Sequence, residues 1–345
     1  MNTSVLRLTS AVAALCLSGC FDPPEAEPFP DDVADASESD DGGSESDGEE
    51  DGEEDGEPPP EGESSTGEAE GLFGAEVTAE GLESLSGGFH YELWAIIDDA
   101  PATVGKFNVD AGGVIVDLDG IAIMDAVFDA GRDLSEATDF VLTIETAGDV
   151  DITPGVSKYL AGPLEGDSSV MVVGDGRALG DDYADAAGQF ILATPTNGPE
   201  TDEASGVWWL DLAVEPAAPG LVLPDLPEGW VYEGWAVLDG VPVTTGRFRS
   251  VDAEDLDAPF SGEEPGPMVP GEDFLVDPPE GVQFPADVRG ATVVITIEPE
   301  PDSDPAPFTL KPLVAEVHPM AATHQSMAMV GQPETFPTMT VTLVE

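Results

Sequence analysis

The chain has 345 residues and an extreme charge balance: 72 aspartates and glutamates face nine lysines and arginines, for a formal net charge of −63. Beyond residue 70, 50 acidic and eight basic residues remain, so this part alone carries a net charge near −42. Nucleic-acid binding is excluded, because it needs clustered lysines and arginines that neutralise phosphates. Attraction to anionic lipid headgroups is excluded for the same reason.

The first 20 residues have the order of an export signal. A single positive charge, Arg7, precedes an apolar run over residues 11–17 and the small residues Ser18 and Gly19. This run is too short for a membrane-spanning helix and has the length of a signal-peptide core. With Cys20 it resembles the lipobox of bacterial lipoproteins, whose cysteine is acylated and becomes the new N-terminus. The alternative is an ordinary signal peptide with an incidental cysteine.

This resemblance implies where the mature chain resides. Residues 1–19 would be removed as a signal peptide, and Cys20 would carry the lipid. The only other cysteine, Cys16, would leave with the signal, so the mature chain would have no disulfide. We therefore expect an exported protein, lipid-anchored in the bacterial cell envelope, at the outer membrane or the cell surface rather than at the inner membrane.

Residues 20–70 are expected to form a disordered acidic linker behind the lipidated cysteine. Aspartate, glutamate, glycine, serine and proline dominate this stretch, and 22 acidic residues lie between positions 21 and 70. Such a composition offers almost no apolar surface to bury. The linker's simplest function is mechanical, because it would hold the following domains away from the membrane.

From residue 71 onwards the sequence predicts an all-β fold with a sandwich-like architecture. Short β-branched and aromatic runs, such as residues 91–97, 140–144 and 292–297, alternate with glycine, proline, aspartate and asparagine. Runs of five to seven residues with frequent turn signals are typical of β-sandwiches. No segment shows a sustained helical period.

The chain contains an internal duplication. Residues 88–107 align without a gap onto residues 229–248, and ten of the twenty positions are identical. Further along, residues 143–145 and 296–298 share the sequence Thr-Ile-Glu. Two tandem homologous modules are therefore expected after the linker, over residues 71–206 and 207–345.

Six residues are candidate anchors of the repeat. Strand alternation places Tyr91 on one face and Trp94 on the other, and the tryptophans are expected to anchor each module's core, with ligand stacking as the alternative. The repeated glycines indicate a β-bulge or a close backbone approach. The six anchors, in copy order, are Tyr91, Trp94, Gly105, Tyr232, Trp235 and Gly246.

This repeated pattern resembles the extracytoplasmic, C-terminal domain of anti-sigma-K factors. A Tyr-Glu-x-Trp strand, a hairpin with proline, Gly-x-Phe and a later Thr-Ile-Glu occur in both copies. The matching stretches are residues 91–107 with 141–154, and residues 232–248 with 293–312. The resemblance implies a β fold and an extracytoplasmic setting. It does not imply sigma-factor inhibition, because the family's intracellular sigma-binding region and membrane helix have no counterpart in this sequence.

The sequence offers no catalytic constellation, so we expect a protein that is not an enzyme and needs no cofactor. Two weak metal sites stay open as alternatives. Asp117 and Asp119 form a short carboxylate cluster of the kind that binds Ca²⁺, although aspartate is also an ordinary turn residue. His318, Met320 and His324 offer imidazole and thioether ligands that suit Cu(I), although methionine is also a common core filler.

Together these features predict an exported, lipid-anchored, non-enzymatic β-sandwich protein that serves as an envelope or cell-surface binding module. Its expected contacts are the membrane, through the lipid, and an envelope protein or a glycan. The alternative is an anti-sigma-like regulatory sensor component, which would act through a membrane-spanning partner.

The charge leads to the first testable prediction. The acidic surface has two explanations, adaptation to a saline habitat or divalent-cation binding. If the first holds, the melting temperature should rise between 0.1 M and 1 M NaCl, because the screening length falls from about 10 Å to about 3 Å. A flat melting temperature would argue against saline adaptation. A rise caused only by millimolar Ca²⁺ would favour cation binding.

Overall fold

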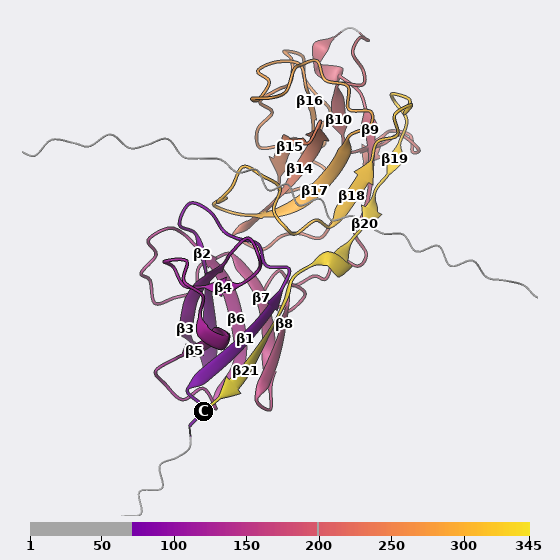
Figure 1. Ribbon diagram of the computed structural model, residues 1–345. Helices are drawn as coiled ribbons and strands as arrows, with labels where there is room; N and C mark the ends of the chain where they lie inside the picture. Colours follow the sequence, from indigo (N-terminus) through magenta and orange to yellow (C-terminus); the bar gives the residue numbers. More distant parts are fainter. Residues whose placement is uncertain (1–70, 199) are drawn as a thin grey trace, which may run out of the picture. The chain divides into compact units, whose positions relative to one another are not determined.

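A computed structural model describes residues 71–198 and 200–345, and the prediction of an all-β fold is confirmed (Figure 1). The expected signal peptide (1–19), Cys20 and the acidic linker (20–70) lie outside the described residues. The described helices are three single 3₁₀ turns, η1 (Met124–Ala126), η2 (Pro195–Asn197) and η3 (Pro333–Thr335). None of these is long and apolar enough to cross a membrane.

Both copies of the repeat form the same three-stranded antiparallel unit. In each copy the strand with the Tyr-Glu-x-Trp sequence lies between its hairpin partner and the strand with Thr-Ile-Glu. The first unit consists of β3 (Ala100–Val109), β2 (His90–Ile97) and β6 (Ala137–Glu145). The second consists of β15 (Val241–Phe248), β14 (Trp230–Leu238) and β17 (Thr292–Pro299).

The hairpins of the two units have the same two-residue turn. Asp98 and Asp99 have φ values of 52° and 60°, and Asp239 and Gly240 have values of 49° and 87°. Two successive positive φ angles define the turn type whose twist matches antiparallel strands, and aspartate and glycine adopt it readily. The sequence therefore sets the pairing register of β2 with β3 and of β14 with β15.

The first unit belongs to a nine-stranded sheet with the order β4-β3-β2-β6-β7-β8-β21-β1-β5. The C-terminal strand β21 lies between β8 and β1, the strand at the start of the described chain (Figure 1). Its other strands are β1 (Gly74–Glu80), β4 (Ile115–Val116), β5 (Val127–Asp129), β7 (Lys158–Glu165), β8 (Ser168–Val172) and β21 (Thr338–Val344).

The second unit belongs to a five-stranded sheet with the order β15-β14-β17-β18-β20. A further sheet follows the order β13-β9-β10-β16, with β19 also paired to β9, and β11 and β12 form a small ribbon. These strands are β9 (Ala187–Leu192), β10 (Gly206–Trp208), β11 (Leu210–Asp211), β12 (Ala218–Pro219), β13 (Leu221–Val222), β16 (Gly271–Asp273), β18 (Leu313–Glu316), β19 (Met327–Ala328) and β20 (Val330–Gly331).

The sheets do not divide the chain where the sequence placed the boundary. The expected boundary between residues 206 and 207 falls inside β10, and β10 pairs with β16 of the second half. Conversely, β21 from the end of the second half completes the first sheet. Turn signals mark where a strand ends, but they do not specify which distant sheet edge that strand joins.

Side-chain alternation along β2 separates two apolar clusters. Tyr91, Leu93 and Ala95 lie in the main core, which extends through both halves of the described chain. Trp94 lies on the opposite face, in a small cluster with Val141, Ala161 and Ala178. The predicted distribution of residues between the two faces is thus present, and Trp94 is buried outside the main core.

Three aromatic rings join the two repeat units. Tyr159 of β7 lies 5.7 Å from Trp230 of β14 and 5.6 Å from Phe308, measured between ring centroids. The Trp230 indole N–H also donates a hydrogen bond to the carbonyl of Lys158, at 3.2 Å. All three rings belong to the buried main core. The two units therefore share one hydrophobic interior.

The position of β21 can be tested by truncating its core-facing methionine. Met339 is 1% exposed, pairs with Met171 of β8 and Ala79 of β1, and belongs to the main core. Met339→Ala should lower the free energy of unfolding by about 2–5 kcal/mol in denaturant titrations, because it leaves a cavity. Thr338→Ala, at an exposed position of the same strand, is the matched control. Equal effects of the two variants would contradict the buried position of β21.

Candidate functional site

A hydrogen-bonded Trp-Thr-Glu chain links the strands of the first repeat unit. The Trp94 indole N–H donates to Thr143 Oγ1 at 3.0 Å, and the Thr143 hydroxyl donates to Glu145 Oε1. The same glutamate oxygen accepts the backbone N–H of Gly155 at 2.8 Å. The chain therefore extends from the outer face of β2 to the loop that follows β6.

The second unit repeats this chain with its own residues. The Trp235 indole N–H donates to Thr296 Oγ1 at 2.8 Å, the Thr296 hydroxyl donates to Glu298 Oε1, and Glu298 accepts the N–H of Phe308 at 3.0 Å. Trp94 and Trp235 are only 1% and 3% exposed. No ligand can stack on rings so deeply buried, so this geometry supports a structural role for both.

Another anchor of the repeat forms a matching bond in each copy. The Tyr91 hydroxyl donates to the carbonyl of Glu83 at 2.9 Å, and the Tyr232 hydroxyl donates to the carbonyl of Pro224 at 2.7 Å. In both copies the acceptor lies eight residues before the tyrosine. Each tyrosine thereby fixes the segment that leads into its strand.

His90, Glu92 and Asp149 form a group whose ligand atoms lie close enough to hold a metal ion. The Lys106 ammonium already occupies this group. Its Nζ lies 3.2 Å from Glu92 Oε2 and 2.8 Å from Asp149 Oδ2. Burial raises the pKa of Glu92, and the hydrogen bond and charge of Lys106 oppose that rise. The lysine serves here as the counter-ion of a buried carboxylate, and a metal would have to displace it.

The second unit lacks this arrangement. Arg247 stands where the first copy has Lys106, but its guanidinium pairs with Asp257 at 3.0 Å. Glu233, the counterpart of Glu92, is 6% exposed, and burial raises its pKa to about 7. Burial likewise raises the pKa of Glu298 to about 8. The interior of the second unit therefore holds carboxyl groups that keep their protons near neutral pH.

The two metal sites suggested by the sequence are not assembled. Asp117 Oδ1 accepts the backbone N–H groups of Asp119 and Ile121 at 3.0 and 2.8 Å, which is the bonding of an ordinary aspartate turn. His318 accepts the N–H of Met320, whose side chain is 81% exposed. His324 instead lies 3.1 Å from Glu203. Among the described residues, the two aspartates and the two histidines belong to no group of three or more His, Cys, Asp or Glu residues with metal-binding spacing.

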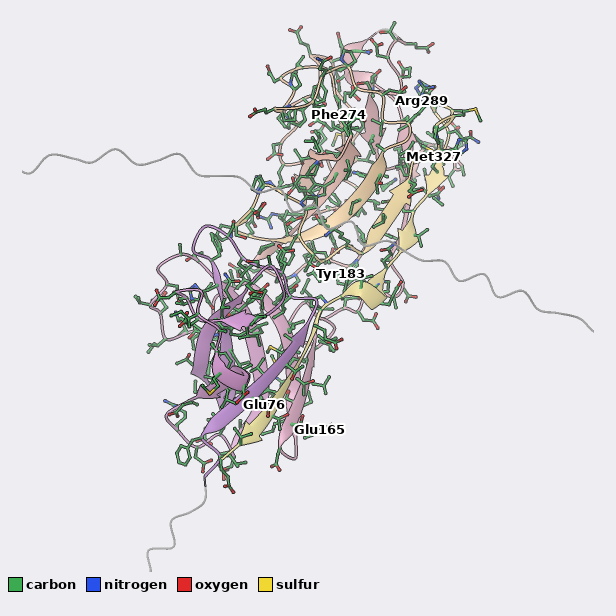
Figure 2. The ribbon with its side chains drawn as sticks, viewed as in Figure 1. Glu76, Glu165, Tyr183, Phe274, Arg289 and Met327 are labelled. Atoms are coloured by element: carbon green, nitrogen blue, oxygen red, sulfur yellow. The ribbon has the colours of Figure 1, made fainter. Side chains whose placement is uncertain are left out.

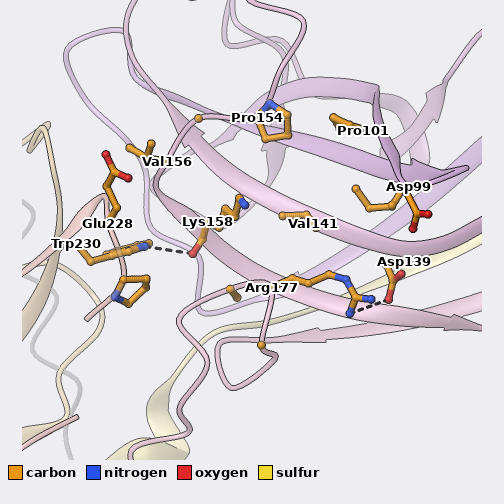
Figure 3. Close-up of a pocket in the computed structure, with 15 residues that line it drawn as sticks. Asp99, Pro101, Asp139, Val141, Pro154, Val156, Lys158, Arg177, Glu228 and Trp230 are labelled. Atoms are coloured by element: carbon orange, nitrogen blue, oxygen red, sulfur yellow. Dashed lines mark hydrogen bonds and ion pairs between the residues drawn. The ribbon is translucent and has the colours of Figure 1, made fainter. Parts of the chain in front are cut away.

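Two hollows lie on the outer face of the first sheet, and Pro227, Glu228 and Trp230 of the second half also line the first of them. The first has a volume of about 710 Å³, and Ile96, Val141 and Ala178 contribute its apolar lining. Figure 3 shows Arg177 reaching across it to Asp139, with Nη1 and Oδ1 3.1 Å apart. The second hollow has a volume of about 550 Å³. Pro101 lines both, so the two hollows are neighbours.

The loop of residues 149–156 separates these hollows and exposes apolar side chains. Val150 is 86% exposed, Ile152 85% and Val156 51%. Residues 149–152 line the second hollow and residues 154–156 line the first. We call the two hollows together with this loop the loop face. Exposed apolar side chains grouped around hollows are typical of an interaction surface.

The loop face also holds the basic residues of the first half. Residues 71–206 contain four basic residues, and all four line one of the two hollows: Lys106, Arg132, Lys158 and Arg177. Lys106 and Arg177 form ion pairs with the buried carboxylates of Glu92 and Asp139. Arg132 and Lys158 are exposed and form no ion pair with another described residue. Six acidic residues line the same hollows: Asp99, Asp139 and Glu228 in the first, and Glu92, Asp149 and Asp151 in the second. Positive charge that could meet a partner's carboxylates is therefore confined to Arg132 and Lys158.

No family model, curated protein or solved structure matches this chain. The resemblance to the anti-sigma-K outer domain therefore gains no support from these comparisons. Function has to be argued from the geometry of the described residues.

Sequence reasoning missed the loop face, although two signals were present. The first is the rarity of basic residues, because a few lysines and arginines that lie close together in so acidic a chain indicate a specific function for that surface. The second is the pattern Asp-Val-Asp-Ile over residues 149–152, which places two large apolar residues in a turn-rich segment. The contact of this loop with Lys106 joins residues 43 positions apart, so no local pattern could reveal it.

The buried carboxyl groups predict an unusual pH dependence. Burial raises five pKa values above those of the unfolded chain, where these groups ionise near pH 4: Glu83, Glu233 and Glu272 to about 7, and Asp255 and Glu298 to about 8. Between these limits the folded state binds more protons than the unfolded state. The free energy of unfolding should therefore fall as the pH rises from 5 to 8.

Glu298→Gln should flatten this decline by about 1.4 kcal/mol per pH unit between roughly pH 5 and 7. Glutamine keeps the oxygen that accepts the Thr296 and Phe308 bonds and does not titrate. Urea titrations of both proteins across this pH range, in the presence of a chelator, measure the difference. A wild-type stability that increases with pH, or an unchanged slope in the variant, would contradict the assignment.

Proposed function

We propose that this protein is an exported, lipid-anchored binding module without enzymatic activity, and that its loop face engages a protein of the cell envelope. The export signal and Cys20 carry the localisation. One observation supports a binding role. All four basic residues between positions 71 and 206 lie around a loop that exposes three aliphatic side chains.

Charge complementarity specifies the partner's chemistry. Most of this chain's surface repels other acidic proteins, since residues 71–345 carry a net charge near −42. On the loop face, Arg132 and Lys158 offer positive charge beside Val150 and Val156. The partner surface should therefore present carboxylates next to apolar side chains. Local attraction within a repulsive surface would orient the partner and favour this face over others.

A regulatory role is a special case of the same proposal. The repeated residues that resemble the anti-sigma-K outer domain would then mark a sensor component, and the protein bound at the loop face would span the membrane. A glycan ligand is the competing occupant, and the experiment below separates it from a protein.

Photo-crosslinking in intact cells tests the proposal. A photoreactive amino acid at Val156 should capture one defined envelope protein, because this side chain is 51% exposed at the rim of the first hollow. Adding Arg132→Glu and Lys158→Glu should lower the yield by about tenfold, equivalent to roughly 1.4 kcal/mol of binding free energy. The same photoreactive residue at Val222, which is 63% exposed on β13, should not capture that protein.

The matched charge control is Arg289→Glu, which changes one exposed arginine away from the loop face (Figure 2). It should leave the yield at Val156 unchanged. Capture that survives the Arg132 and Lys158 reversals, or that occurs equally at Val222, would overturn the loop face as the binding surface. Loss of capture after glycan removal would instead identify a glycan as the occupant. A captured membrane-spanning regulator would favour the sensor role.

A further inference from the structure

The two copies of the repeat differ in their interior beside Gly105 and its counterpart Gly246, where the first copy has apolar side chains and the second has polar ones. In the first copy Leu93 and Val104 fill the space beside Gly105, and the Phe128 ring packs against this glycine. A methyl group built on Gly105 would lie 2.4 Å from Phe128 Cδ1. This part of the first copy is closed by apolar side chains.

In the second copy polar groups take the same positions. Gly234 stands for Leu93, Thr245 for Val104, and Gly246 for Gly105. A methyl group on Gly234 would lie 2.1 Å from Thr245 Oγ1 and 2.8 Å from the Trp209 indole nitrogen. One on Gly246 would lie 2.8 Å from Asp255 Oδ1. The carboxylate of Asp255 thus occupies the place that Phe128 fills in the first copy.

Asp255 lies between the edges of two sheets. Its Oδ2 accepts the N–H of Gly271 in β16 at 2.7 Å, while its Oδ1 lies against Gly246 of β15. The next residue of β16, Glu272, is paired with Val207 of β10 and therefore shares its face. That face is the main core, which also contains Trp209, two residues further along the same segment. Glu272 is thus directed inward, where the Ser261 hydroxyl donates to its Oε1 and where its charge acts on Asp255.

Four polar atoms in this region are buried and have no hydrogen-bond partner among the described residues. They are Trp209 Nε1, Thr245 Oγ1, Asp255 Oδ1 and Glu272 Oε2. Glu272, Thr245 and Trp209 are 0% exposed. Buried polar groups are nearly always satisfied, because an unpaired one costs the full desolvation penalty. Two unpaired carboxyl oxygens and a hydroxyl oxygen therefore lack a partner that the described protein groups do not supply.

We infer that the second module binds a hard divalent cation of the calcium type between β15 and β16, through oxygens of Asp255, Glu272 and Thr245. All three side chains are oxygen donors, which suits Ca²⁺ and excludes metals that require nitrogen or sulfur ligands. Water completes the coordination, and the Trp209 N–H donates to a ligand oxygen. Asp255 also lines a hollow of about 260 Å³ with Glu254 and Glu264, which gives the ion an acidic entry path.

The charges around this region support the assignment. The charged groups that act on the pKa of Asp255 are Glu272 and Asp257, and that of Glu272 is raised further by Asp273. Arg247, the basic residue on β15, pairs with Asp257 instead. Burial and these carboxylates raise the pKa of Asp255 to about 8 and that of Glu272 to about 7.

Thermal unfolding of the full chain with CaCl₂ tests the inference. In about 1 M NaCl, which screens general charge effects, about 1 mM Ca²⁺ should raise the melting temperature by roughly 3–6 °C. Asp255→Asn and Glu272→Gln should each abolish the shift. The double variant Asp117→Asn with Asp119→Asn, which neutralises the exposed turn, should keep it.

A second readout does not depend on the stability of the carboxylate variants. Tb³⁺, a luminescent substitute for Ca²⁺, should be sensitised through Trp209 and displaced by CaCl₂. Thr245→Val, which restores the residue type of the first copy, should weaken Tb³⁺ binding by about tenfold. The inference is overturned if Ca²⁺ causes no shift, if the shift survives Asp255→Asn and Glu272→Gln, or if Thr245→Val leaves Tb³⁺ binding unchanged.

Discussion

In each repeat unit a threonine hydroxyl links a buried tryptophan to a glutamate, and the glutamate in turn binds the backbone of a loop that follows the unit's third strand. In the first copy Thr143 positions Glu145, whose carboxylate holds Gly155 and with it the loop of the loop face. In the second copy Thr296 positions Glu298, whose carboxyl oxygen accepts the backbone N–H of Phe308. Phe308 packs on Tyr159, so this loop joins the two units. One hydrogen-bonded chain thus supports an exposed loop in one copy and an internal contact in the other.

Duplication also let the two interiors diverge. The first copy is closed by Leu93, Val104 and Phe128, whose burial is favourable without any partner. The second has Thr245 and Asp255 in their place, and these groups stabilise the fold only when their polar atoms are satisfied. The first copy therefore shows that the same strand arrangement forms a closed hydrophobic core when the side chains at these positions are apolar. The polar version makes physical sense as a binding site rather than as a core.

The features that could be predicted from the sequence are those that neighbouring residues determine, namely the hairpin turns and the two faces of each strand. Aspartate and glycine at the hairpins gave the register, and alternation along β2 placed Tyr91 and Trp94 on opposite faces. The position of β21 could not be predicted in this way, because strand alternation does not specify which distant sheet a strand joins. The burial of Asp255 was equally hidden. In a chain with 72 acidic residues, nothing local distinguishes a carboxylate that ends up between two sheet edges from one that faces solvent.

Basic residues are rare in this chain, and their positions determine which buried carboxyl groups have a counter-ion. Lys106 sits beside the buried Glu92, and Arg177 beside Asp139, which is 5% exposed. Lys311 likewise lowers the otherwise raised pKa of Glu83. These three basic residues are thus placed beside buried or partly buried carboxyl groups. Asp255 and Glu272 lack such a basic partner, because the charged groups that act on them are other carboxylates. Their neutralisation therefore has to come from outside the chain, and a divalent cation between β15 and β16 would supply the charge that no basic residue provides.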